Sequence, residues 1–205
     1  MLARLRPLYN KIIAPIGNFS YKLGLTADLW TIISLLFAIA AGYMRSQNQY
    51  WAGLVLGILM YMADGLDGAT ARASGKTSGF GTVFDHTVDR YAEFILIGGL
   101  LLGGGISNFA AILSASGMVM ASYVRAKAES AAGISDCTVG IAGRAEKLIL
   151  MFLGFIFLGV SLPKLAEYAF ILIGIVSHIT AIQRLLYTRT QSMQKNSIRT
   201  NTFVE

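Results

Sequence analysis

Charged side chains are scarce in this chain: they make up 14% of its 205 residues, compared with about 25% in a typical soluble domain. Hydrophobic residues make up 55% and are gathered in long runs. This composition is typical of an integral membrane protein. The 22 glycines, against three prolines, suit closely packed membrane helices, in which small residues let backbones approach each other.

Cysteine and histidine are also scarce. Cys137 is the only cysteine, which excludes an intramolecular disulfide and a Cys-x-x-Cys metal motif. The two histidines are His86 and His178, so a histidine-based metal site is not expected. Residues 1–25 are basic and lack a continuous apolar core, and they are therefore not predicted to be a signal peptide. No internal repeat is evident, so we expect one domain.

Six apolar stretches follow one another, and each is predicted to span a membrane as a helix. They cover residues 29–44, 51–72, 81–102, 108–127, 145–160 and 165–186. Residues 1–24 place apolar side chains at spacings of three and four among basic ones, which predicts an amphipathic juxtamembrane helix, kinked or divided by Pro7 and Pro15. Residues 190–205 form a polar tail. The sequence thus predicts an all-α, polytopic membrane protein with a single domain over residues 1–189.

The basic residues predict which side of the membrane each loop faces. With six spans, all but three of the 17 lysines and arginines lie on the side that holds both termini; the exceptions are Arg45, Arg90 and Lys164. Because cytoplasmic loops carry the excess of lysine and arginine, both termini are predicted to be cytoplasmic, in the cell (plasma) membrane. This topology accounts for the net charge of +6 without a nucleic-acid partner.

Four aspartates lie close together in the sequence. Asp64 and Asp67 are three residues apart, and Asp85 and Asp89 are four apart, so each pair shares one helix face. Four convergent carboxylates are costly to bury unless cations hold them, and hard divalent ions take oxygen ligands alongside substrate phosphates. The pattern predicts a two-metal site for phosphate chemistry, with Asp89 taking the proton of an attacking hydroxyl. A structural ion-pair cluster and the ion pathway of a transporter are the alternatives.

The aspartate region resembles the signature of the CDP-alcohol phosphotransferase family at every specified position. The matching run is Asp64-x2-Asp67-Gly68-x2-Ala71-Arg72-x8-Gly81-x3-Asp85-x3-Asp89. The resemblance implies an enzyme that transfers a substituted phosphate from a CDP-linked donor to an alcohol and releases CMP. It implies homodimers and two divalent cations, Mg²⁺ or Mn²⁺, held by Asp64, Asp67, Asp85 and Asp89, with Asp89 as general base. It also implies a CDP pocket lined by Asp67, Gly68, Ala71, Arg72, Gly81 and Asp85.

Two segments beside the aspartates add to this site. The start of the first span, ADLWT at residues 27–31, is similar to the family's Pro-Asn-x-x-Thr element near the nucleotide. Thr31 matches, whereas Asp28 departs and either accepts a hydrogen bond at the nucleotide or caps the helix. Arg90 and Glu93 are expected to form a pair that holds Asp89 or Asp67 in place.

Four basic residues lie at the cytoplasmic ends of predicted spans in the second half: Arg125, Lys127, Arg144 and Arg184. If these ends converge, they form an anion pocket for a phosphorylated acceptor; alternatively, they are snorkelling charges. Segments 122–129 and 140–147 resemble the branch that makes phosphatidylinositol phosphate or archaetidylinositol phosphate, which implies inositol 1-phosphate as the acceptor. Gly143 departs from this branch, which more often has glutamate there.

The sequence therefore predicts transfer of a phosphatidyl or archaetidyl group from a CDP-lipid to inositol 1-phosphate, by direct displacement at the cytoplasmic face. Two alternatives keep the chemistry and change one substrate: glycerol 3-phosphate as the acceptor, or CDP-inositol as the donor. A non-enzymatic membrane protein that binds ions is a third alternative.

Overall fold

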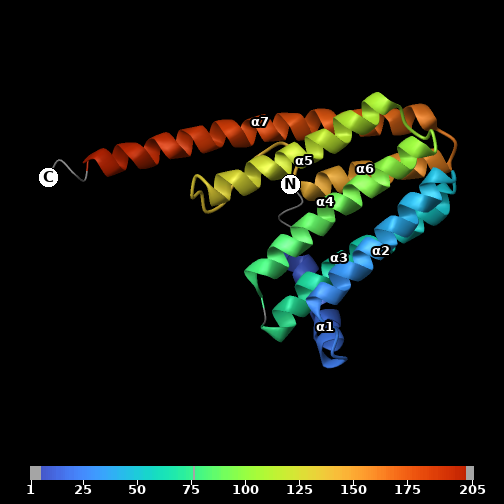
Figure 1. Ribbon diagram of the computed structural model, residues 1–205, viewed down its shortest axis with the longest axis horizontal. Helices are drawn as coiled ribbons and strands as arrows, with labels where there is room; N and C mark the ends of the chain where they lie inside the picture. Colours follow the sequence, from blue (N-terminus) through green and yellow to red (C-terminus); the bar gives the residue numbers. More distant parts are fainter. Residues whose placement is uncertain (1–5, 76, 202–205) are drawn as a thin grey trace.

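The computed structural model describes residues 6–75 and 77–201, and in this part of the chain it is all-helical (Figure 1). The helices are α1 (Arg6–Lys22), α2 (Ala27–Ser46), α3 (Tyr50–Ser74), α4 (Gly79–Leu102), α5 (Asn108–Ser130), α6 (Arg144–Gly159) and α7 (Pro163–Asn201). Residues 1–5 of the predicted juxtamembrane helix and residues 202–205 of the predicted tail lie outside the described residues. The all-α prediction is confirmed for the described part.

Each of the six predicted spans corresponds to one helix, α2 to α7, but only four of these meet the length and composition needed to cross a membrane. The four are α2, α3, α5 and the Pro163–Gln194 part of α7. The 16 residues of α6 make a helix about 24 Å long, shorter than a hydrocarbon core of about 30 Å. The first half of α4 carries the charges of Asp85, Asp89, Arg90 and Glu93. The prediction of six spans is therefore confirmed only in part.

Local capping sets where the helices begin and end. Thr26 is the N-cap of α2, and its hydroxyl accepts a hydrogen bond from the backbone N–H of Leu29 at 3.2 Å. Asp28 lies inside the first turn, so its suggested role as the helix cap is wrong. Ser78 caps α4 in the same way, and α3 ends at Gly75 with a φ of +64°, a left-handed conformation that glycine adopts without strain.

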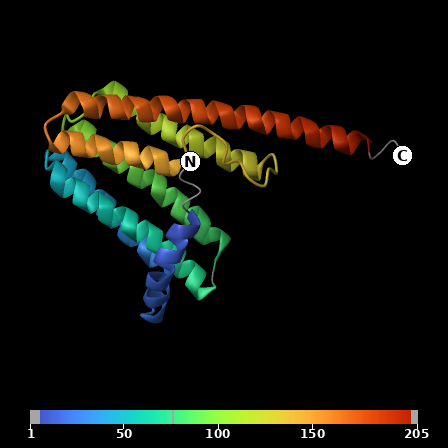
Figure 2. The ribbon, with the colours of Figure 1, turned by 180° about the vertical axis from the view of Figure 1, so that it is seen from behind.

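The helices form two groups that meet along α3, α4, α5 and α6 (Figures 1 and 2). In one group, α2 packs against both α3 and α4, and α1 packs on α3. In the other, α7 packs against α5 and α6. Contacts of α3 with α6 and of α4 with α5 join the groups. The site aspartates of α3 and α4 therefore lie beside helices of the second group.

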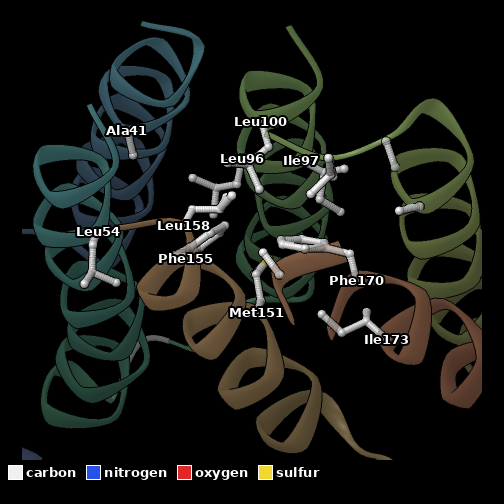
Figure 3. Close-up of a cluster of buried hydrophobic side chains, with 14 of the residues drawn as sticks. Ala41, Leu54, Leu96, Ile97, Leu100, Met151, Phe155, Leu158, Phe170 and Ile173 are labelled. Carbon is white, nitrogen blue, oxygen red and sulfur yellow. The ribbon is translucent and has the colours of Figure 1, made fainter. Parts of the chain in front are cut away.

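A continuous apolar core joins the two groups. Leu96 and Leu100 of α4 lie near Phe155 of α6, which faces Phe170 of α7 with ring centroids 5.9 Å apart (Figure 3). All four side chains are almost completely buried. Because this core spans α4, α6 and α7, it fixes how the aspartate helices sit against the basic second half.

Helix α1 leaves an apolar face uncovered. It buries Ile13 and Gly17 against the bundle, while Ile12, Ile16 and Phe19 are at least half exposed. This distribution fits an amphipathic helix at a membrane surface. The helix continues through Pro15, so that residue does not divide it.

Helix α7 is longer than expected. It runs without interruption from Pro163 to Asn201 and extends beyond the neighbouring helices (Figure 1). The predicted polar tail is therefore helical as far as Asn201, and the predicted boundary after residue 189 is not a helix end. A polar sequence without glycine or proline does not stop a helix.

Candidate metal and substrate site

The structure brings together the four aspartates that were predicted from their spacing. Asp64 and Asp67 lie on α3, and Asp85 and Asp89 lie on α4. Ligand oxygens of Asp64, Asp67 and Asp85 lie within 4.8 Å of one another. Asp89 joins the group through Arg144, whose Nη2 contacts both Asp64 and Asp89. The aspartate pair of α3 and the aspartate pair of α4 therefore face the same place, as the predicted metal site requires.

The chemistry of this cluster fits hard divalent cations. Asp67 and Asp89 are each 6% exposed, and Asp64 and Asp85 are partly buried. Buried carboxylates at this density repel one another, and each needs a positive or hydrogen-bonding partner. The donors are all carboxylate oxygens, the ligand type that Mg²⁺ and Mn²⁺ prefer.

Helix α2 contributes a hydrogen bond to the cluster. The hydroxyl of Thr31 donates to Oδ2 of Asp67 at 2.9 Å, and Thr31 is 3% exposed. Because α2 is packed on both aspartate helices, this bond holds one oxygen of Asp67 in a fixed direction. The other oxygen, Oδ1, accepts from the backbone N–H of Gly68.

Arg144, the first residue of α6, reaches the same place from the second half of the chain. Its Nη2 lies 3.3 Å from both carboxylate oxygens of Asp64 and forms a close ion pair with Oδ1 of Asp89. Arg144 is separated from Asp89 by 55 residues and from Asp64 by 80. The sequence predicted Arg144 as an acceptor-phosphate residue, and its contact with the aspartates was not foreseen.

The expected pair of Arg90 and Glu93 is confirmed. Arg90 Nη1 lies 2.6 Å from Glu93 Oε2 and also donates to the hydroxyl of Ser122 on α5 at 3.0 Å. Its Nη2 is 3.8 Å from Asp89 Oδ2. Arg90 therefore ties Asp89 to α5, the helix that carries two of the predicted acceptor residues.

The residues predicted to bind the nucleotide lie near the N-terminal ends of α2 and α4 and the C-terminal end of α3. A Cβ at Gly68 would lie 3.2 Å from Nη1 of Arg72, so the arginine side chain folds over this glycine. A Cβ at Gly81 would lie 3.8 Å from Oδ1 of Asp28, which places Asp28 at the start of α4. Asp28 and Arg72 are exposed, and Ala71 is partly buried. A Cβ at Gly68 would meet only the flexible end of the exposed Arg72 side chain, so packing by itself does not require glycine there.

The other basic residues predicted for the acceptor have separate partners. Arg125 pairs with Glu129 at 2.9 Å, and Lys127 lies over the ring of Tyr123 at 5.9 Å. Arg184 is 7% exposed and donates to the backbone carbonyls of residues 139 and 121, at 3.0 and 2.6 Å. The structure thus places Arg144 on the aspartates and Arg184 between α5 and the 131–143 loop, and their binding of an acceptor stays a prediction.

One buried cation near the site was missed by the sequence analysis. Lys147 is 5% exposed. It follows Arg144 by three residues on α6, so the two lie on the same helix face. The spacing of three residues from Arg144 was the signal in the sequence that would have identified Lys147.

Comparison with known proteins identifies relatives along most of the chain. The model of the CDP-alcohol phosphatidyltransferase family matches residues 24–186. Archaetidylinositol phosphate synthase of Pyrococcus horikoshii is 38% identical over 186 residues, which cover 90% of this chain and 95% of that protein. Archaetidylinositol phosphate synthase of Methanothermobacter thermautotrophicus is 35% identical over 187 residues, with 91% and 93% covered.

Solved structures of similar proteins share the fold. Phosphatidylinositol phosphate synthase of Mycobacterium tuberculosis with CDP-DAG bound superposes with a TM-score of 0.76 at 28% identity, covering 87% of this chain and 94% of that one. The same enzyme in complex with manganese and citrate gives a TM-score of 0.75 at 29% identity, with 86% and 88% covered. Taken with the aspartate cluster, these matches show that the chain belongs to the CDP-alcohol phosphatidyltransferase family and is a transferase of phospholipid biosynthesis.

Proposed function

We propose that this protein transfers the phosphatidyl or archaetidyl group of a CDP-lipid to inositol 1-phosphate and releases CMP. The observation that carries the proposal is the meeting of the four aspartates of α3 and α4 with Arg144 of α6. In this arrangement the carboxylates can bind cations and accept a proton, and the neighbouring arginine side chain can bind a phosphate. Relatives named as archaetidylinositol phosphate synthases, and a similar structure with CDP-DAG bound, support the choice of substrates.

The proposal places α2 to α7 across the cell membrane, with both termini and the aspartates on the cytoplasmic side. The short α6 and the charged α4 cross because their polar residues face the bundle, where Arg90 pairs with Glu93. The exposed apolar side chains of α1 rest on the cytoplasmic surface. We also expect the protein to act as a homodimer in the bilayer, as the family resemblance implies.

In this proposal, Asp64, Asp67, Asp85 and Asp89 hold two divalent cations, Mg²⁺ or Mn²⁺. The oxygen-only donor set and the manganese complex of the Mycobacterium tuberculosis enzyme support this assignment. When bound, the cations neutralise the diphosphate of the donor and stabilise the departing CMP.

The nucleotide lies at the open ends of α2, α3 and α4. The residues proposed to bind CDP are Asp28, Thr31, Asp67, Gly68, Ala71, Arg72, Gly81 and Asp85. The atoms that would lie nearest a Cβ at Gly68 belong to the flexible Arg72 side chain, and a nucleotide that displaces this side chain can approach the glycine backbone closely. The exposed guanidinium of Arg72 then supplies charge near the donor's phosphates.

The acceptor lies between the aspartates and the second half of the chain. Its phosphate is held by basic residues, proposed to be Arg125, Lys127, Arg144 and Arg184. Their guanidinium and ammonium groups suit the oxygens of a phosphate. Asp89 accepts the proton of the inositol hydroxyl, whose oxygen attacks the lipid-linked β-phosphate while the bond to CMP breaks.

The proposal is tested by measuring CMP release from a CDP-lipid by the purified protein in detergent with Mg²⁺. Inositol 1-phosphate, glycerol 3-phosphate, serine and free inositol are compared as acceptors. The variant Asp89→Asn is expected to abolish release, because it removes the proton acceptor and one ligand charge. The control Asp136→Asn changes an exposed loop aspartate to its isostere and is expected to keep wild-type activity.

Each outcome has a distinct meaning. Release with inositol 1-phosphate alone, lost in Asp89→Asn, supports the proposal. Release only with glycerol 3-phosphate refutes the assignment of the acceptor and keeps the aspartate site. Activity only when CDP-inositol replaces the lipid refutes the assignment of the donor. No release with any donor or acceptor refutes the reaction itself.

A further inference from the structure

Arg144 is expected to bind the acceptor phosphate, yet its partners in the structure are two of the expected cation ligands. One nitrogen, Nη2, lies 3.3 Å from both oxygens of Asp64 and in ion-pair contact with Asp89. A single guanidinium thus bridges two carboxylates and reduces the repulsion between them in a partly buried site. Arg144 therefore binds the same two carboxylates that divalent cations need as ligands.

We propose that Arg144 exchanges partners. Without divalent cations it bridges Asp64 and Asp89, and once these carboxylates hold cations it turns to the phosphate of the acceptor. The inference rests on the proposed function for the identity of the acceptor, but its first half concerns only Arg144 and the aspartates.

The backbone before Arg144 is anchored, so the exchange is a rotation of the side chain. The N–H of Ile141 donates to Gln183 Oε1 at 2.9 Å, and the N–H of Gly143 donates to Glu146 Oε2 at 3.0 Å. These bonds fix the loop to α7 and to the first turn of α6. The side chain of Arg144 is 41% exposed, so the protein does not enclose it on all sides.

Arg184, unlike Arg144, has partners that are not expected cation ligands. It is 7% exposed, and its guanidinium is engaged by two backbone carbonyls, which cations do not compete for. It therefore stays in place whether or not cations are bound. Among the four basic residues proposed for the acceptor, Arg144 is the one whose described partners are expected cation ligands.

Electrostatics gives the direction of the exchange. A divalent cation on Asp89 repels a guanidinium at contact distance and takes the oxygen that the guanidinium had bound. A phosphate is then the complementary partner, because a guanidinium binds its oxygens with two parallel hydrogen bonds. Two ligands coupled in this way strengthen each other's binding by the same factor.

The test uses the full chain in detergent without CDP-lipid, so that no turnover occurs. Mn²⁺ binding is read from the electron paramagnetic resonance signal of free Mn²⁺, and inositol 1-phosphate binding by calorimetry with and without Mn²⁺. The variants are Arg144→Gln, which removes the charge, and Arg144→Lys, which keeps it. Arg189→Gln is the matched control, since Arg189 is an exposed arginine of α7.

In the wild type and in Arg189→Gln, saturating Mn²⁺ is expected to tighten inositol 1-phosphate binding at least about fivefold, the lower end of typical coupling. Arg144→Gln should bind Mn²⁺ at least about fivefold more tightly than the wild type, because its competitor is gone, and should lose most of the coupling. The coupling that remains in this variant measures the direct attraction between cations and phosphate. Arg144→Lys should bind Mn²⁺ close to the wild-type level.

Unchanged or weaker Mn²⁺ binding by Arg144→Gln overturns the exchange, whatever the acceptor is. Full coupling retained in that variant overturns it as well. If the wild type with Mn²⁺ does not bind inositol 1-phosphate, the proposed acceptor is wrong, and the Mn²⁺ affinity of Arg144→Gln still decides whether Arg144 competes with cations.

Discussion

At the scale of single residues, Asp67 depends on another helix for its orientation. Thr31 of α2 donates to Asp67 Oδ2 at 2.9 Å in a buried setting. Outer partners of this kind are worth 10- to 100-fold in metal affinity or activity. Thr31→Val is therefore expected to weaken Mn²⁺ binding by about tenfold, measured without nucleotide, while Thr31→Ser retains it. Wild-type affinity in Thr31→Val would show that Asp67 is held by other contacts.

Arg45 is a second residue with unusual surroundings. It lies in the last turn of α2, at the opposite end of that helix from Thr31. It is 1% exposed, its Cζ lies 3.7 Å above the ring of Phe155, and none of its side-chain nitrogens has a hydrogen-bond partner among the described residues. Gly53 and Gly57 of α3 make room for it, since a Cβ at either would lie within 3.0 Å of its side chain. Arg45 and the ring of Phe155 thus form a buried cation–π pair.

This environment predicts opposite sensitivities for the two partners. Arg45→Met removes a buried charge and keeps an unbranched chain in the socket, so the free energy of unfolding should change by less than about 1 kcal/mol or rise. Phe155→Leu leaves the charge without its ring and opens space, and should cost about 2–3 kcal/mol. Thermal unfolding in detergent checks both. A loss in Arg45→Met as large as in Phe155→Leu would contradict this account.

At the scale of helices, α2 and α4 come into close contact where a glycine of each helix lies at the crossing. A Cβ at Gly99 would collide with the backbone of Gly42, whereas a Cβ at Gly98 would meet nothing within 4 Å. Because α2 carries Thr31 and α4 carries two site aspartates, this crossing also sets the spacing of the site.

The two neighbouring glycines make a matched pair of substitutions. Gly99→Ala should force the helices apart and lower the free energy of unfolding by about 1–3 kcal/mol, with weaker Mn²⁺ binding. Gly98→Ala should leave stability unchanged or raise it by up to about 1 kcal/mol, since alanine favours a helix more than glycine. Equal effects of the two substitutions on thermal unfolding would argue against a close crossing at Gly99.

Helix positions followed from the apolar runs, but helix ends did not. The apolar stretch at residues 29–44 became α2, which begins at Ala27 because the cap is the polar residue Thr26. The same holds for α4, whose cap Ser78 lies outside the apolar stretch. Caps are read from side-chain hydrogen bonds to backbone N–H groups, which hydrophobicity does not report.

At the scale of the whole molecule, the proposed topology predicts which positions a membrane-impermeant reagent can label from each side of the membrane. Cys137 is completely buried, so cysteine labelling has a low background. Gln47→Cys, after α2, should react with a membrane-impermeant maleimide on intact cells. Thr190→Cys, on α7, should react only after the membrane is opened; both positions are exposed. The reverse pattern would invert the topology, and labelling of both from outside would contradict six spans.

The sequence by itself determined the helical, membrane-type architecture and the four aspartates, because apolar runs and helix-face spacing are local properties. Only the tertiary structure decided which side chains meet at the site. Thr31 reaches Asp67 across 36 residues, and Arg144 reaches Asp89 across 55. No periodicity reports such contacts, because they depend on how α2 packs on α3 and α4 and on how α6 packs on α3. Arg144 was placed in the acceptor pocket from its charge and context, and packing set it against the aspartates.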